Sequence, residues 1–457
     1  MMHDTNVLVI GGGMTGLCAA YYLAKQLGDG LMLIEADEVV GGTSRTDHLD
    51  GFTCEWGPNG FLDKEPLTLQ WAEDLGIGTE LLRADAASAH RFVYRNGTLH
   101  EVKGPPAFFL SPLLSRRARA RLVCEPLIRR KRDDTPETIW DFAARRIGRE
   151  AADILVSSMV SGVYGGDAKN LSLAHCFPKM AAMEREYGSL TRALLAKRRT
   201  NKEASAAGPS GTLTSFNAGI GYLPQAAAQQ LNSHIRTGTG AVRIVRKKNL
   251  YEVSTTTGDT ITARAVVVAV PAFAAAAMTE GLDQHLPSAL KGIPYAGLSV
   301  VCAGYRREDV GHDLDGFGFL APRVERLRAL GCIWTSTVFP GRAPSDWVLL
   351  RVMYGGSTDP DAVKLTDDEL VGWLEKDIHP LLHVRKRPEF LRVYRHARGI
   401  PQYPLGHGHR LKSIAAAEEH NPGLVFAGNA YRGVSLNDCV VSAHDAAAKV
   451  MKTLESA

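Results

Sequence analysis

Residues 6–37 read NVLVIGGGMTGLCAAYYLAKQLGDGLMLIEAD, and this stretch decides how the chain begins to fold. The opening NVLVI is typical of a buried parallel strand, and residues 14–27 have the composition of a helix. Between them, Gly11, Gly13 and Gly16 have the spacing G-x-G-x-x-G. That spacing permits a tight turn, backbone approach to a pyrophosphate, and close packing of the helix on the strand.

Near its end, the same stretch has an acidic residue, Glu35, at the separation from the glycines that is typical of a ribose-binding carboxylate. Residues 31–34 predict a second strand, and Glu35 follows Gly16 at about the 20-residue offset where a carboxylate binds an adenosine ribose. An anion is expected at the N-terminus of the intervening helix, where unpaired N–H groups point outward. The stretch therefore predicts a dinucleotide site, with the choice between NAD and FAD still open.

Length, charge and cysteine content limit the class of protein. At 457 residues the chain exceeds what one hydrophobic core usually supports, so we expect two or more domains. A net charge of +4 is too small to indicate a nucleic-acid partner. The seven cysteines are scattered and form no C-x-x-C pair, which favours reduced thiols over disulfides or structural zinc. We expect a cytoplasmic protein with no metal, no signal segment and no membrane span.

Segments that suit nucleotide binding recur at both ends of the chain. The second strand is followed by GGTSR at 41–45, and the loop at 56–66 reads WGPNGFLDKEP. Residues 260–271 and 423–438 predict further strands of the same domain. An NAD dehydrogenase would need only the first βαβαβ half of the fold plus a contiguous catalytic domain. A cofactor as long as FAD is bound by both ends of the chain, so this arrangement favours FAD.

Six motifs together carry a family resemblance. They read GGGMTGL at 11–17, GGTSRT at 41–46, WGPNGF at 56–61, SGVYGGDAKNLS at 161–172, GIPQYPLGHG at 399–408 and GNAYRGVSLNDC at 428–439. On these motifs the chain resembles the FAD-dependent protoporphyrinogen and coproporphyrinogen oxidases, within the flavin amine oxidase superfamily, over essentially its full length. The first two motifs belong to the whole superfamily, whereas the last three are specific to the porphyrinogen oxidases.

The resemblance implies a fold of the α/β class with three parts. A discontinuous, Rossmann-like FAD-binding domain is expected at residues 1–80, 210–275 and 400–457. An α+β substrate-binding domain is expected at residues 81–105 and 276–399, and a helical, membrane-facing insert at residues 106–209. We also expect a homodimer.

The resemblance assigns residues to non-covalently bound FAD along the whole cofactor. The expected FAD-binding residues are Gly11, Gly13, Gly16, Glu35, Gly42, Arg45, Gly57, Val242, Asn437, Asp438, Cys439 and Val440. The three fingerprint glycines would cradle the pyrophosphate, and Glu35 would hold the ribose. Val242 would offer its backbone to adenine. Arg45 would continue along the diphosphate, with an ordinary surface cation as the alternative.

The last motif is expected to meet the flavin ring. Asn437 and Asp438 would open the final helix. The N–H groups that follow, at Cys439 and Val440, would then face N1 and O2 of the isoalloxazine, where reduced flavin gathers negative charge. The alternative is a helix cap without a ligand, because Asn and Asp are good capping residues in any helix.

The resemblance also predicts a mostly apolar pocket for a flat tetrapyrrole. Its expected lining residues are Arg91, Asn59, Gly165, Gly166, Leu320, Ile333 and Met353. Arg91 would pair with a substrate propionate, with Arg95 and Lys64 as alternatives. Asn59 and Gly165 would line the flavin, and taken alone the three aliphatic side chains would suit a core equally well. No side chain is assigned a certain catalytic role, because flavin N5 performs the chemistry.

The resemblance implies oxidation of protoporphyrinogen IX to protoporphyrin IX in three two-electron steps, with O₂ as acceptor, in haem biosynthesis. Coproporphyrinogen III is the alternative substrate, a flavin amine oxidase is a more distant alternative, and a flavin or porphyrin carrier is a non-enzymatic one. Residues 316–344 resemble the protoporphyrinogen enzymes of plants and myxobacteria, whereas abundant arginines at 115–132 would suit extra propionates. Hand-off of the product to ferrochelatase is a further expectation.

The segment at 105–132 predicts docking on an anionic membrane surface. Its apolar residues are Phe108, Phe109, Leu110, Leu113 and Leu114, and its basic residues are Arg116, Arg117, Arg119, Arg121, Arg129, Arg130, Lys131 and Arg132. Lipid phosphates attract such basic side chains, and apolar neighbours would enter the interface. A solvated basic face is the alternative. We therefore expect peripheral attachment to the inner face of the cell membrane.

Overall fold

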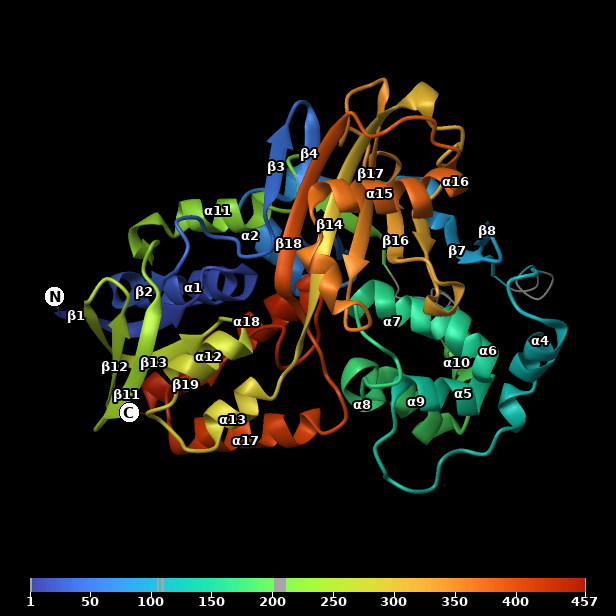
Figure 1. Ribbon diagram of the computed structural model, residues 1–457. Coiled ribbons are helices and arrows are strands. Elements are labelled where there is room, and N and C mark those ends of the chain that lie inside the picture. The colour runs from blue at the N-terminus through green and yellow to red at the C-terminus, as the bar shows by residue number, and fades with distance from the viewer. Residues whose placement is uncertain (1, 105–106, 108–110, 201–210, 457) are drawn as a thin grey trace.

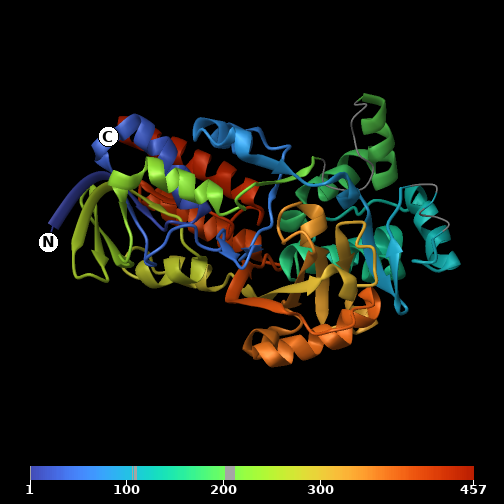
Figure 2. The same cartoon turned by 90° about the horizontal axis from the view of Figure 1, so that it is seen from above.

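The computed structural model describes residues 2–104, 107, 111–200 and 211–456. Within that part of the chain, two seven-stranded sheets form the framework, and a group of helices lies beside the second sheet (Figure 1). Both chain ends lie at the first sheet, away from those helices, and the view in Figure 2 agrees.

The first sheet is parallel at its centre. Its strand order is β10 (Ile235–Arg236), β2 (Leu31–Ile34), β1 (Met2–Ile10), β13 (Thr260–Val268), β12 (Leu250–Thr255) and β11 (Ala241–Lys247), with β19 (Leu424–Phe426) also paired to β13. Because β1 pairs in parallel with both β2 and β13, distant parts of the chain share one sheet. The strands predicted within 260–271 and 423–438 therefore lie in it.

Helices cover both faces of this sheet, which is why its central strands are apolar throughout. Val7 and Val9 share one hydrophobic core with α1 (Met14–Leu27), α11 (Tyr222–Gln230) and α18 (Leu436–Glu455). Leu8 and Ile10 point the other way and share a second core with α12 (Ala272–Met278), α13 (Leu286–Lys291) and α17 (His407–His420). The alternation along β1 thus fixes which helices lie on which face.

The second sheet is mostly antiparallel. Its strand order is β18 (Phe390–Pro401), β14 (Tyr295–Arg306), β17 (Trp347–Gly355), β16 (Ala329–Trp334), β15 (Gly318–Leu320), β7 (Arg91–Arg95) and β8 (Thr98–Glu101), with β15 and β7 parallel. One face is covered by α15 (Asp367–Asp377) and α16 (His379–Leu382). The other face meets Phe52 and Cys54 of a hairpin formed by β3 (Thr46–Leu49) and β4 (Phe52–Glu55).

Smaller elements join the two sheets. A three-stranded sheet has the order β5 (Phe61–Leu62), β9 (Leu213–Phe216) and β6 (Leu81–Arg83), and α2 (Pro66–Asp74) follows β5. A short helix, α14 (Thr335–Val338), follows β16. The packing differs from two predicted domain boundaries, those after residues 80 and 275. β6, which follows the first boundary, pairs with β9 of the predicted FAD-binding domain, and residues 286–293, which follow the second, lie in the core of the first sheet. Both segments were expected in the substrate-binding domain.

The helical group spans residues 116–200. It consists of α4 (Arg116–Val123), α5 (Ile139–Ile147), α6 (Arg149–Ala151), the π-helical segment η5 (Ala152–Val156), α7 (Ser157–Tyr164), α8 (Leu173–Cys176), α9 (Pro178–Tyr187) and α10 (Leu190–Thr200). No helix among the described residues is long and apolar enough to cross a membrane.

Part of the predicted membrane segment faces inward. Leu113 and Leu114 are 1% and 2% exposed and pack in a core with Val93, so the expectation that they contact lipid is wrong. Arg121 also turns inward, donating to the carbonyl oxygens of Arg146 at 3.0 Å and of a neighbouring residue at 2.6 Å. Phe108, Phe109 and Leu110 lie outside the described residues.

A buried ion-pair network holds the helical group together. Arg146 is fully buried and pairs with the carboxylates of Glu125 and Glu184. Glu125 also accepts hydrogen bonds from Ser189 Oγ at 2.6 Å and from the backbone N–H of Thr191 at 3.1 Å. Burial alone would raise the pKa of the Glu125 carboxyl, but these hydrogen bonds lower its pKa to about 2.

We predict that Glu125→Gln destabilises the protein, because it leaves the buried Arg146 cation short of one counter-charge. The free energy of unfolding should fall by about 3 kcal/mol at neutral pH. Since the folded-state pKa is lower than that of an unfolded Glu, the difference should shrink as pH falls from about 4.5 towards 2. Urea unfolding across this pH range measures both effects. Glu186→Gln, on the exposed face of α9, is the control and should change nothing.

Candidate active site

The turn between β1 and α1 forms a cradle of bare backbone. A Cβ on Gly11, whose φ is +105°, would lie 2.7 Å from the carbonyl oxygen of Ala269. A Cβ on Gly16 would lie 1.8 Å from the carbonyl oxygen of Gly11, so only glycine lets the helix approach the strand this closely. At Gly13 a Cβ would meet no described atom within 4 Å.

The N-terminus of α1 is open towards the same space. Its N-cap is Gly13, and no side chain accepts a hydrogen bond from the first turn. Uncapped N–H groups at a helix N-terminus attract phosphate. The cradle therefore has both the room and the donors that a pyrophosphate requires.

Glu35 lies directly after β2, beside the cradle. Its Oε2 accepts a hydrogen bond from the Gly12 N–H at 2.5 Å, and its Oε1 accepts one from the Asp37 N–H at 2.9 Å. Each carboxylate oxygen can accept a further bond, so ribose hydroxyls can still bind there. The structure thus fixes the orientation of the carboxylate through the same loop that forms the cradle.

The loop after Glu35 closes over the cradle. The Gly41 N–H donates to the Gly12 carbonyl at 2.8 Å, and a Cβ on Gly42 would lie 3.4 Å from the Cα of Gly13. Arg45 pairs with Asp37 at 2.9 Å, and its guanidinium lies over the ring of Trp56. The Arg45 charge is therefore already paired with a carboxylate of this loop.

Val242 lies at an irregularity of β11. The register of the β11–β12 ladder shifts between Ala241 and Arg243, and Val242 has no partner residue in it. A residue in such a bulge keeps its backbone groups outside the ladder. The Val242 side chain is 52% exposed, so the position is accessible to a ligand.

The final helix begins differently from the prediction. Ser435 is its N-cap and forms a capping box with Asp438, whose N–H donates to Ser435 Oγ at 3.1 Å. The Cys439 N–H donates to the Ser435 carbonyl at 3.1 Å. The prediction that the N–H groups of Cys439 and Val440 face the flavin is therefore wrong. The first-turn N–H groups without a helical partner belong to Leu436 and Asn437.

Asn437 has a structural role that the sequence did not show. Its Nδ2 donates to the Leu62 carbonyl at 2.8 Å, and its Oδ1 accepts from Thr68 Oγ1 at 2.8 Å. Both polar atoms of the amide are thus used to join α18 to β5 and α2. The side chain holds the helix N-terminus in place.

The loop at 56–59 brings the cradle and the second sheet together. A Cβ on Gly57 would lie 2.5 Å from the Thr43 carbonyl, and His396 of β18 contacts the Trp56 carbonyl at 2.9 Å. Asn59 is 8% exposed, yet neither amide atom has a hydrogen-bond partner. Buried amides are normally satisfied, so Asn59 indicates that a polar ligand belongs beside it.

Three predicted substrate residues lie on one face of the second sheet. Leu320 and Met353 both pair with Gly331, from opposite sides, and Ile333 is two residues further along the same strand. All three side chains are partly exposed. This face is opposite to the one covered by α15 and α16.

Gly165 and Gly166 end α7 close to this face. Gly165 has φ +55°, and a Cβ there would touch the Leu298 side chain at 3.5 Å. The Ser357 N–H donates to the Gly165 carbonyl at 2.7 Å. A Cβ on Gly166 would lie 2.5 Å from Gln402 Oε1, so this glycine serves internal packing as well.

Arg91, the predicted partner of a substrate propionate, and its alternative Arg95 differ in whether a carboxylate already pairs with them. Arg91 is exposed and lies over the ring of Phe317, and no described carboxylate lies within 4 Å of its guanidinium. Arg95 is already paired with Glu150 at 3.3 Å and with Glu325 at 3.5 Å. Of these two arginines, Arg91 therefore has its charge available for an anion.

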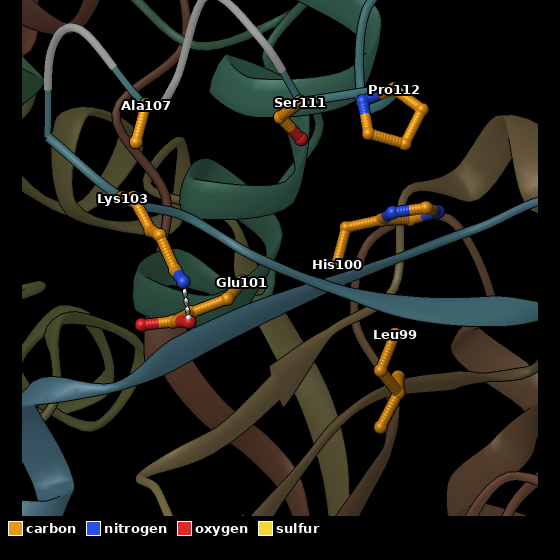
Figure 3. Close-up of a pocket in the computed structure, with 7 residues that line it drawn as sticks. All are labelled: Leu99, His100, Glu101, Lys103, Ala107, Ser111 and Pro112. Carbon is orange, nitrogen blue, oxygen red and sulfur yellow. Dashed lines mark ion pairs between the residues drawn. The ribbon is translucent and has the colours of Figure 1, made fainter.

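Two hollows lie outside the cradle. The larger, about 390 Å³, is lined by Leu99, His100, Glu101, Lys103, Ala107, Ser111 and Pro112, with an ion pair of 3.0 Å between Lys103 and Glu101 (Figure 3). The smaller, about 160 Å³, is lined in part by Gly166, Lys169 and Arg323. Of the two, the smaller one contains a predicted substrate residue. Among the described residues no group of three His, Cys, Asp or Glu side chains could hold a metal ion.

Comparison with known proteins identifies the class. The family model described as flavin containing amine oxidoreductase matches residues 14–451. The chain is 29% identical over 455 residues to coproporphyrinogen III oxidase of Bacillus subtilis, covering 95% of each chain. It is 30% identical over 478 residues to chloroplastic protoporphyrinogen oxidase 1 of Spinacia oleracea, covering 98% of this chain and 84% of that one.

A solved structure agrees with these relatives. A protein from Exiguobacterium, provisionally called a protoporphyrinogen oxidase, superposes with a TM-score of 0.84 at 26% identity, with 100% of both chains covered. The chain belongs to the flavin-containing amine oxidoreductase family. It is an FAD-dependent oxidoreductase, and the residues at the cradle suit that cofactor, because Gly13 leaves room for it and the first turn of α1 is uncapped.

We predict that Gly13→Ala weakens FAD binding without harming the apoprotein. Gly13 has φ −75°, which any residue adopts, and its added methyl would enter only the space left for the cofactor. FAD affinity should fall about tenfold or more, as judged by titration of apoprotein with quenching of flavin fluorescence. The melting temperature of the apoprotein should stay unchanged.

Gly16→Ala is the matched comparison for the same substitution. Its methyl would collide with the Gly11 carbonyl, so the apoprotein itself should lose stability. A Gly13→Ala variant with wild-type FAD affinity would show that the cofactor does not occupy the cradle.

Proposed function

We propose that the protein oxidises protoporphyrinogen IX to protoporphyrin IX, in three two-electron steps with O₂ as acceptor, as part of haem biosynthesis. The observation that carries this proposal is the face of Leu320, Ile333 and Met353, which adjoins the unpaired cation of Arg91 through the β7–β15 pairing. An apolar surface with a cation at its edge suits a flat macrocycle that carries carboxylates only on its rim. The names of the two relatives agree with this class of substrate.

The chain's own residues bind and orient the substrate. FAD held non-covalently at the cradle of Gly11, Gly13 and Gly16 would supply the hydride acceptor for a carbon of the macrocycle. Arg91 would fix one propionate through a guanidinium–carboxylate pair, which sets the rotation of the ring within the pocket. The aliphatic face would exclude water from the reacting carbon, and Gly165 would leave room for the ring edge. No side chain needs to act as a nucleophile.

Coproporphyrinogen III is the second candidate, and the Bacillus subtilis relative favours it. This substrate carries two more propionates, which the arginines of the helical group were expected to serve. Two of those arginines are already used, because Arg121 donates to the carbonyls of Arg145 and Arg146 and Arg130 donates to the Arg185 carbonyl at 3.3 Å. That use of the arginines favours the substrate with fewer carboxylates.

The test compares both porphyrinogens in one assay, with peroxide and porphyrin fluorescence measured under air. We expect faster turnover of protoporphyrinogen IX and reduction of the bound flavin by this substrate without oxygen. Faster turnover of coproporphyrinogen III would select the alternative. Absence of flavin reduction by either would exclude the whole class, and reduction by primary amines instead would indicate an amine oxidase.

In the same assay, Arg91→Ala should raise KM far more than it changes kcat, because a propionate pair binds ground state and transition state alike. An exposed ion pair worth up to about 1 kcal/mol predicts a rise in KM of about three- to fivefold, with kcat nearly unchanged. Arg95→Ala is the control, since its partners are Glu150 and Glu325. A wild-type KM in Arg91→Ala would move the propionate site to Lys64 or elsewhere.

We also propose that the protein is cytoplasmic and attaches to the inner face of the membrane through the helical group. The surface that supports this differs from the predicted one. It contains two exposed apolar side chains, Val123 at 61% and Leu127 at 76%. Around them are the exposed Arg116, Arg117, Arg129, Arg130 and Arg132. A homodimer and hand-off of the product to ferrochelatase stay predictions of the family resemblance.

Vesicle co-sedimentation tests the membrane proposal. Wild-type protein should bind anionic vesicles at low salt more tightly than neutral ones. Leu127→Ser and the pair Arg129→Ala with Arg132→Ala should each weaken binding, the latter by about tenfold or more at about 1 kcal/mol per arginine. Leu250→Ser, an exposed apolar position on the first sheet, is the control. Equal binding to both vesicles, or none at low salt, would contradict the proposal.

A further inference from the structure

Several buried polar atoms without partners gather where the cradle meets the second sheet. Arg351 of β17 is 3% exposed, and its Nε has no hydrogen-bond partner. The Nε1 of Trp56 and both amide atoms of Asn59 also lack hydrogen-bond partners. Arg351 reaches the same loop, because its Nη2 donates a hydrogen bond to the carbonyl of Gly57. Unsatisfied buried groups are rare, so such a group of them indicates a missing polar partner.

The charge of Arg351 is also unbalanced. No described carboxylate lies within 4 Å of its guanidinium. Glu55 influences Arg351 from further away, but Glu55 lies 3.6 Å from Arg342 and accepts hydrogen bonds from Thr46 Oγ1 at 2.6 Å and the Ile220 N–H at 3.0 Å. Two buried guanidinium groups therefore share one carboxylate.

The neutral groups around Arg351 do not supply the missing charge. The contact with Cys302 and burial raise the pKa of the Cys54 thiol, and burial raises the pKa of the Tyr394 phenol. His396, on β18 and separated from β17 by β14, has its pKa lowered by burial and by Arg351, so it stays neutral near pH 7. Arginine keeps its charge in proteins. One positive charge thus remains uncompensated in a buried place, where charges are normally paired.

The position of Arg351 indicates which anion would balance it. Its side chain lies on the same face of β17 as Met353, and it holds the carbonyl of Gly57, which packs against Thr43 of the loop that closes the cradle. The pyrophosphate belongs at Gly13, which the preceding residue of that loop, Gly42, approaches. A propionate on the rim of a macrocycle has the exposed Arg91 available, whereas Arg351 is buried at the junction.

We propose that Arg351 is the counter-charge for the isoalloxazine ring of FAD. Reduction by two electrons and one proton leaves the ring with one extra negative charge, and a fixed cation in a water-excluded place stabilises that charge more than it would in water. Arg351 therefore raises the flavin midpoint potential and favours hydride uptake. The proposal concerns the cofactor alone and does not depend on which porphyrinogen is the substrate.

The test measures the flavin in the holoenzyme without any organic substrate. Sulfite adds to the isoalloxazine and leaves it negatively charged, so its dissociation constant reports the counter-charge. Arg351→Met should raise that constant about ten- to hundredfold. The same change in the relative affinity for reduced FAD lowers the midpoint potential by about 30 to 60 mV.

Two further variants separate charge from packing. Arg351→Lys keeps the charge and should retain most of the sulfite affinity and potential, whereas Arg351→Gln keeps donors without charge and should behave as Arg351→Met does. Arg328→Met is the control, since Arg328 is paired with Asp359 at 2.7 Å beside the same sheet. If Arg351→Met does not fold, the Lys and Gln variants decide the question. Equal potentials in those two, or a wild-type potential in Arg351→Met, would overturn the proposal.

Discussion

The cofactor site depends on one backbone contact between a strand and a helix. A Cβ on Gly16 would lie 1.8 Å from the Gly11 carbonyl oxygen. Helix α1 can therefore approach β1 only because residue 16 has no side chain. This approach directs the uncapped first turn of α1 across the end of the sheet, where Gly13 leaves open space. Glu35 is held at the same place by its hydrogen bond to the Gly12 N–H. The geometry that binds a dinucleotide is thus built from main-chain atoms, with one carboxylate added.

A second constraint is the way the substrate-facing sheet is attached to this cradle. The hairpin of β3 and β4 packs Phe52 against Phe390 of β18, with ring centroids 4.1 Å apart, and the loop that follows the hairpin contacts both β17 and β18. The same loop packs against Thr43 of the loop that closes the cradle. Asn59 and Arg351 thus have their unpartnered polar atoms at this junction, outside the hydrophobic cores, where a ligand can satisfy them.

Exposure and charge pairing separate the residues that can bind a ligand from those that hold the fold. Arg91 and Arg95 lie on one strand, four residues apart, yet only Arg95 has carboxylate partners among the described residues. In the segment 105–132, the sequence predicted that Leu113 and Arg121 contact lipid, but both turn inward. Composition could not distinguish them, because an amphipathic segment has the same residue types whether its apolar side meets lipid or a neighbouring helix.

The sequence by itself determined the β1–α1–β2 unit, the G-x-G-x-x-G turn and the family, because local spacing and periodicity fix backbone conformation. The sequence also shows Arg351 as the one charged residue within the apolar stretch VLLRVMYG at 348–355, but the spacing of residues assigns it no role. Only the tertiary structure decided that Asn437 joins the last helix to β5 and α2, and that Arg351 has no carboxylate within 4 Å among the described residues. Those facts depend on partners brought together from distant parts of the chain, and no local pattern records which side chains will meet.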